Sequence, residues 1–116
     1  MRIISQDGTI DVPYEYISLV VSIGKCKDVE HVCIYCHNIS APHGTRLAEY
    51  SSKAKAIKAM EMLREQYSRI EIIKALASGT CKHMEESLKP EEFKDILKKY
   101  INMEVFQFPQ DDEIEV

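Results

Sequence analysis

Cysteine and histidine side chains gather in one short stretch of this chain, where they are suited to metal or thiol chemistry. His31, Cys33, Cys36 and His37 lie within seven residues. The run Cys33-Ile34-Tyr35-Cys36-His37 has the C-x-x-C-H spacing of a haem-attachment motif. That attachment is typical of exported proteins, and the first residues, MRIISQDG, lack the apolar core of a signal peptide. Haem is therefore the least favoured interpretation.

Zinc is the stronger metal hypothesis, because thiolates and imidazoles are its usual ligands. Cys33 and Cys36 would need two more ligands from the remaining candidates, which are Cys26, His31, His37, Cys81 and His83. However, Ile34 and Tyr35 favour a strand, in which Cys33 and Cys36 point to opposite faces. We therefore expect no metal, and a small zinc-binding structural protein stays as an alternative.

No arrangement of residues predicts catalysis. Cys81 and His83 are the best nucleophile and base, but a spacing of two does not bring side chains together on a helix. The chain has neither a G-x-G-x-x-G motif nor a Walker-type loop, and no carboxylate pair stands out. We expect no catalytic residue, no cofactor and no enzyme.

The charge balance disfavours nucleic-acid binding. The chain has 15 basic and 19 acidic residues, a net charge of −4. Four of the acidic residues lie in the tail 110–116, so the remainder is neutral. A DNA or RNA binder needs a basic face, whereas a small anionic nucleotide needs only two or three donors. No apolar run approaches the 18 residues of a membrane span, and we expect a cytoplasmic protein.

A helix over Tyr50–Tyr67 is the element that must position any site. Ser51 or Ser52 is a suitable N-cap, and apolar residues recur at helical spacing at Ile57, Met60, Leu63 and Tyr67. We predict an α+β fold of one domain over residues 1–109. In it an N-terminal antiparallel β-meander packs against two or three helices, and a C-terminal strand returns to the sheet. Residues 110–116 would form a mobile acidic tail.

Turn signals and residue alternation define the remaining elements. The predicted strands are Met1–Ser5, Thr9–Val12, Tyr14–Ile23, Val29–Asn38, Thr45–Glu49 and Glu104–Phe108, with a loop at Ala41–Gly44. Ser68 would cap a second helix over Arg69–Ala77, although alternation there also suits a strand. Cys81–Leu88 would add a turn or two of helix, and Pro90 would begin the last helix.

Aromatic residues near the ends of these elements are either core or base-stacking surfaces. Tyr50, Tyr67, Tyr100, Phe106 and Phe108 are of this kind. An aromatic ring stacks on a base, and Arg64 can hold a phosphate through two hydrogen bonds. Core packing remains the more common role for each ring.

Three blocks of the sequence resemble a known family. They are MRIISQDGTIDVPYE (Met1–Glu15), AEYSSKAKAIKAMEMLREQY (Ala48–Tyr67) and VFQFPQDDEIEV (Val105–Val116). Together they cover about 40% of the chain. The chain resembles the Thoeris anti-defence 1 proteins, which are small proteins of phages and mobile elements of Gram-positive bacteria. The Cys-rich segment Lys25–Thr45 does not share the resemblance.

The resemblance implies a non-enzymatic sponge that acts inside an infected bacterial host. Such a protein binds cyclic ADP-ribose isomers, and in some members cyclic oligonucleotides, and keeps them from the defence effector. It also implies a homo-oligomer, either a dimer or a hexamer built from dimers. Arg64, Asn102, Phe106 and Phe108 lie in or beside the matched blocks and have suitable chemistry for the ligand. The alternative is a protein-interaction module that inhibits a host protein through the acidic tail.

Overall fold

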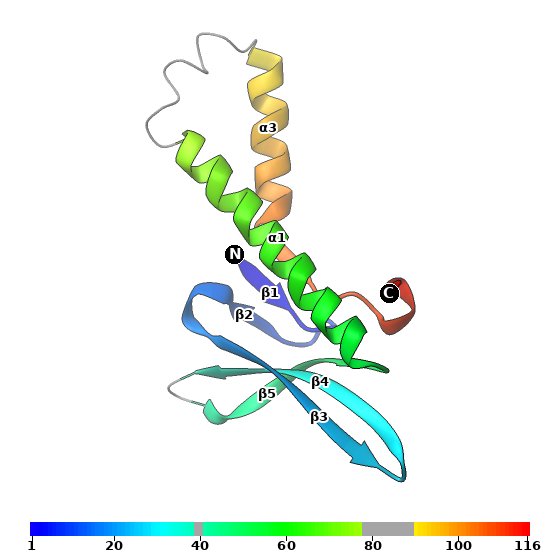
Figure 1. Ribbon diagram of the computed structural model, residues 1–116. Coiled ribbons are helices and arrows are strands. Elements are labelled where there is room, and N and C mark those ends of the chain that lie inside the picture. Colours follow the sequence, from blue (N-terminus) through cyan, green and yellow to red (C-terminus); the bar gives the residue numbers. More distant parts are fainter. Residues whose placement is uncertain (39–40, 78–89) are drawn as a thin grey trace.

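The described part of this α+β protein forms two three-stranded sheets and two α-helices (Figure 1). The computed structural model describes residues 1–38, 41–77 and 90–116. The strands are β1 (Arg2–Ile4), β2 (Asp11–Pro13), β3 (Ser18–Cys26), β4 (Val29–Asn38), β5 (Ala41–Tyr50) and β6 (Val105–Gln107). The helices are α1 (Lys53–Ala77) and α3 (Pro90–Met103), with short 3-10 turns at η1 (Tyr14–Tyr16) and η2 (Asp111–Glu113).

The strands divide between the sheets according to how far apart they lie in the sequence. β3, β4 and β5 form an antiparallel meander from consecutive segments. The other sheet has the order β2-β1-β6, in which β1 is antiparallel to β2 and parallel to β6. Ile3 of β1 lies opposite both Val12 and Phe106. The predicted α+β class, the antiparallel meander and the C-terminal strand that returns to a sheet are confirmed. The division of the strands into two sheets was not predicted.

One continuous helix replaces the two that were expected on either side of Ser68. The N-cap is as predicted, since the Lys55 N–H donates to the Ser52 hydroxyl at 3.2 Å. Leu63 and Ile70, seven residues apart, are both completely buried. Their common face continues across Ser68, which lies exposed on the other side of α1. The prediction of a helix start at Ser68 was therefore wrong, because tertiary packing outweighs a local capping signal.

Smaller differences concern the ends of strands. Tyr14–Tyr16 forms η1, and β3 begins only at Ser18. β5 already begins at Ala41, where a loop was expected. Ile57 was assigned to the apolar face of α1 but is exposed, and Ala56 is buried in its place. The prediction for Cys81–Leu88 lies outside the described residues.

A single core joins both sheets to α1. Its members come mainly from β1, β4, β5, α1 and the C-terminal segment, by which we mean Val105–Val116. The largest are Ile3, Ile34, Leu47, Tyr50, Leu63, Ile70, Phe106 and Phe108. Beyond the sheets, α1 and α3 lie side by side (Figure 1). The molecule measures 61 × 34 × 21 Å. No helix among the described residues has the length and apolar character needed to cross a bilayer.

The C-terminal residues pack against the body, contrary to the expectation of a mobile tail. Ile114 is buried within the common core. Asp111 accepts hydrogen bonds from the backbone N–H and the hydroxyl of Ser51, at 2.7 and 2.9 Å. The Lys55 ammonium lies 3.2 Å from the same carboxylate. These contacts fix the tail to the start of α1.

Candidate functional site

A hollow of about 480 Å³ lies on the side of α1 that faces away from the core. The described residues that line it all belong to α1 and are exposed: Glu61, Arg64, Glu65, Ser68, Arg69 and Ile72. We call it the α1 hollow. The continuity of α1 through Ser68 creates it, because a helix break there would separate Arg64 from Arg69.

The charged side chains of the α1 hollow are available to a ligand. Within the described part of the chain, neither Arg64 nor Arg69 has a carboxylate within 4.0 Å, and Glu61 and Glu65 have no basic partner there either. A guanidinium group binds a phosphate through two parallel hydrogen bonds. A carboxylate accepts hydrogen bonds from ribose hydroxyls. The hollow thus combines groups for phosphate and for sugar.

Ile72 adds an apolar side chain to these polar groups. Ile72 is exposed at the C-terminal end of the hollow. Burying an aliphatic side chain against the flat face of a base removes apolar surface from water, which is favourable. Ser68 adds a hydroxyl that both donates and accepts hydrogen bonds.

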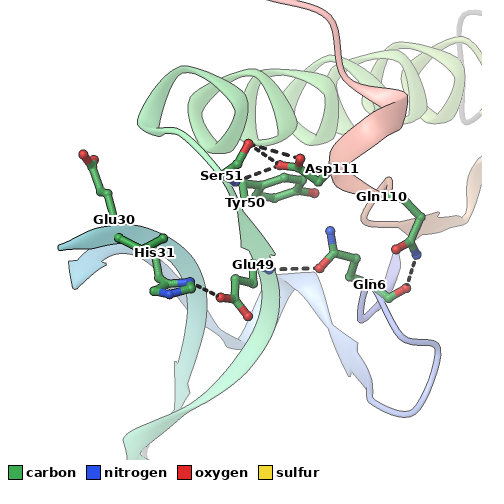
Figure 2. Close-up of a pocket in the computed structure, with 9 residues that line it drawn as sticks. Gln6, Glu30, His31, Glu49, Tyr50, Ser51, Gln110 and Asp111 are labelled. Carbon is green, nitrogen blue, oxygen red and sulfur yellow. Dashed lines mark hydrogen bonds and ion pairs between the residues drawn. The ribbon is translucent and has the colours of Figure 1, made fainter. Parts of the chain in front are cut away.

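A second pocket of about 360 Å³ lies where the β4–β5 sheet meets the C-terminal segment (Figure 2). We call it the seam pocket. Its lining residues are Gln6, Val29, Glu30, His31, Glu49, Tyr50, Ser51, Gln110 and Asp111. Most of their polar groups bond to one another. His31 Nδ1 lies 2.6 Å from Glu49 Oε1, and the Glu49 backbone N–H donates to Gln6 Oε1 at 3.0 Å.

The seam pocket is a poor site for an anion. Three carboxylates line it, from Glu30, Glu49 and Asp111. The hydrogen bond from the Ser51 backbone N–H lowers the pKa of Asp111, so this carboxyl stays ionised. Tyr50 donates its hydroxyl proton to the Pro109 carbonyl at 2.8 Å, and burial raises the pKa of that hydroxyl. These contacts hold the sheet and the C-terminal segment together.

The four residues proposed from the sequence lie in different places. Arg64 lines the α1 hollow, whereas Asn102 is exposed near the end of α3. Phe106 and Phe108 are buried and pack edge to face with ring centroids 5.4 Å apart. Neither ring offers a face for base stacking unless the core opens. The structure therefore does not bring these four residues together.

Ser68, Arg69 and Ile72 were not among the residues proposed from the sequence. Their spacing from Arg64 is four, five and eight residues, which puts them on a shared helical surface only if the helix is continuous. The expected break at Ser68 hid this relationship. A longer helical window over Tyr50–Ala77 would have revealed it.

The cysteines of β4 do not form a metal site in the described structure. Cys33 and Cys36 are free and buried. Cys36 belongs to the main core with Val32 and Ile34, and Cys33 does not, in keeping with opposite faces of the strand. The described residues contain no group of three or more metal-ligating side chains placed to hold an ion. Cys81 and His83 lie outside these residues.

Comparisons with family models, with curated proteins and with solved structures find no significant match to this chain. The resemblance to anti-defence proteins therefore remains an expectation from the sequence, and the functional argument below depends on the site itself.

Proposed function

We propose that this protein binds and sequesters a small cyclic nucleotide of the cyclic ADP-ribose class, without converting it. The observation that carries the proposal is the pair of exposed guanidinium groups of Arg64 and Arg69, which line the α1 hollow without a partner among the described residues. The sequence resemblance suggests the same class of ligand. In a phage-infected bacterium, such binding would keep the signal from a defence effector.

The groups of the hollow match the parts of such a ligand. Arg64 and Arg69 would hold the two phosphates of the pyrophosphate, each through charge-assisted hydrogen bonds. Glu61 and Glu65 would accept hydrogen bonds from the ribose hydroxyls. Ile72 would pack against the adenine. The hollow is wide and open to solvent, so polar contacts rather than enclosure would hold the ligand there.

Titration calorimetry with a cyclic ADP-ribose isomer tests this assignment, with a cyclic trinucleotide as the second titrant. We expect saturable binding of one ligand per protomer. Arg64→Ala and Arg69→Ala should each weaken it by about 10- to 100-fold, since a hydrogen bond to a charged group contributes about 1.5–3 kcal/mol. Arg64→Lys should restore only part of the affinity, because an ammonium lacks the planar fork.

Lys58→Ala is the matched control. Lys58 is an exposed basic residue of the same helix that does not line the hollow. This variant should bind like the wild type, apart from a small effect of net charge. Equal losses in all three alanine variants, or none in the two arginine variants, would refute the placement of the ligand in the α1 hollow.

A further inference from the structure

The six described residues that line the α1 hollow divide into two flanks and a middle strip. An α-helix turns by about 100° per residue, so Arg64 and Arg69 project from the axis about 140° apart and lie about 7.5 Å apart along it. The other lining residues project at angles between these two, and they are Glu61, Glu65, Ser68 and Ile72. The hollow therefore has a guanidinium group on each flank, and carboxylates, a hydroxyl and an isoleucine along its middle.

Glu61 and Glu65 are the charged members of the middle strip. They are four residues apart, which makes them neighbours on the helix surface, and both are exposed. Two carboxylates at this spacing repel each other. In the described part of the chain neither lies within 4.0 Å of a basic group, although Glu65 and Arg69 have the spacing and order that favour an ion pair. Their negative charge is therefore available to act on a ligand in the hollow.

The charges of the hollow balance each other. Two guanidinium groups and two carboxylates line it, so its net charge is zero. Sites for phosphate-rich ligands are instead built from clusters of basic groups. A carboxylate accepts a hydrogen bond from a ribose hydroxyl but repels a phosphate at the same position. Dinucleotide-binding proteins use this contrast, with an acidic residue at the ribose of NAD and an arginine at the 2′-phosphate of NADP.

We propose that Glu61 and Glu65 make the α1 hollow selective for a dinucleotide whose ribose hydroxyls are free, and against the same dinucleotide with a phosphate on a ribose. This selectivity rests on the proposed function and defines the chemical class of its ligand. Ser68 lies between the two arginines, so the pyrophosphate would lie over it. Glu65 and Glu61 follow within about two turns toward the N-terminal end of the hollow, where the riboses would lie. An added ribose phosphate would meet a carboxylate there.

Two titrations of the full chain test the selectivity. The probes are a cyclic ADP-ribose isomer and the same compound with a 2′-phosphate on its adenosine ribose. Both are measured by calorimetry at about 0.15 M salt, where distant charges are screened. We expect the wild type to bind the unphosphorylated ligand about tenfold more tightly, because like charges about 4 Å apart repel even in a solvated site.

Glutamine variants test the role of the carboxylates. Glu61→Gln and Glu65→Gln each remove one charge and keep an oxygen that accepts a hydrogen bond from a hydroxyl. Each variant should bind the unphosphorylated ligand within about fivefold of the wild type, since a neutral acceptor replaces a charged one, and should lose most of the preference. The double variant should prefer the 2′-phosphate, because the arginines then act on it without opposing carboxylates. A purely structural role would lower both affinities together and leave their ratio unchanged.

Glu71→Gln is the matched control. Glu71 is exposed on the same helix, does not line the hollow, and lies 3.9 Å from the Lys74 ammonium. Its substitution changes the net charge by the same amount, and the preference of the wild type should remain. An equal loss of preference in this variant would overturn the proposal, because overall charge would then set the selectivity.

Failure of this selectivity differs from failure of the proposed function. If the wild type binds both ligands equally, or binds the 2′-phosphate more tightly, the protein sequesters a dinucleotide but its carboxylates do not select it. The same conclusion follows if Glu61→Gln and Glu65→Gln keep the full preference. If the wild type binds neither ligand, the proposed function is itself wrong and the selectivity is overturned with it.

Discussion

At the scale of single residues, the turn between β1 and β2 depends on Asp7. Its Oδ1 accepts hydrogen bonds from the Ser5 and Thr9 hydroxyls at 2.6 and 2.7 Å, and from the Thr9 backbone N–H at 3.0 Å. These bonds favour the ionised carboxylate and lower its pKa from 3.8 to about 2. Gly8 follows at φ +78°, a conformation that side chains disfavour. The turn signal at Asp7-Gly8 in the sequence thus has a clear structural cause.

This arrangement predicts the titration of Asp7. Carbon-13 NMR should find its carboxyl pKa near 2 in the wild type. Thr9→Ala removes the hydroxyl donor and should move that pKa upward toward 3.8, with Ser5→Ala having a similar effect. An unchanged pKa in both variants would contradict the hydrogen-bond explanation.

The same shift predicts how stability depends on pH. Because the folded pKa lies below the unfolded one, the ionised Asp7 stabilises the fold above pH 4, and this contribution is lost as the pH falls toward 2. Urea unfolding should show that Asp7→Asn is less stable than the wild type at pH 7. The difference should shrink steadily between pH 4 and pH 2.5. A constant difference over that range would exclude this linkage.

Residue type alone did not identify the residues that line the α1 hollow. Phe106 and Phe108 have the chemistry of a stacking platform, but strand alternation and the returning chain bury both. Arg64 was proposed for its guanidinium group and does line the hollow. Arg64 is exposed and the two phenylalanines are buried because a charged group must stay near the surface, whereas an aromatic ring packs equally well in a core.

At the scale of elements, the C-terminal segment acts as part of the body. Deleting the Ile114 side chain beyond Cβ should destabilise the fold by about 2–5 kcal/mol, as for other buried aliphatic residues. Urea unfolding of Ile114→Ala measures this. Val116→Ala is the control, because Val116 is 75% exposed whereas Ile114 is 5% exposed. Similar midpoints for the two variants would show that the tail does not dock.

Elements with strong local signals were well predicted from the sequence. Pro90 begins α3, β4 spans Val29–Asn38 as expected, and Ser52 caps α1. Pairings between distant segments could not be read in the same way. The parallel partner of β6 is β1, about a hundred residues away, and no local pattern specifies it. The length of α1 was likewise decided by the burial of Ile70.

At the scale of the whole molecule, the proposed ligand site lies apart from the common core. The α1 hollow is on the solvent side of the helix, whereas Leu63 and Ile70 are buried on the opposite side. Substitutions in the hollow should therefore change binding without unfolding the protein. In urea unfolding, Arg64→Ala and Arg69→Ala should keep the midpoint of the wild type. A large loss of stability in either variant would contradict this separation.

The most direct measurement of the central claim is the fate of bound ligand. Protein and a cyclic ADP-ribose isomer would be mixed at equal concentrations well above micromolar, freed of unbound ligand, and denatured by heat. Mass spectrometry of the released material should recover one intact ligand per protomer. Recovery of a cleaved product would contradict sequestration, and the absence of retained ligand would contradict binding.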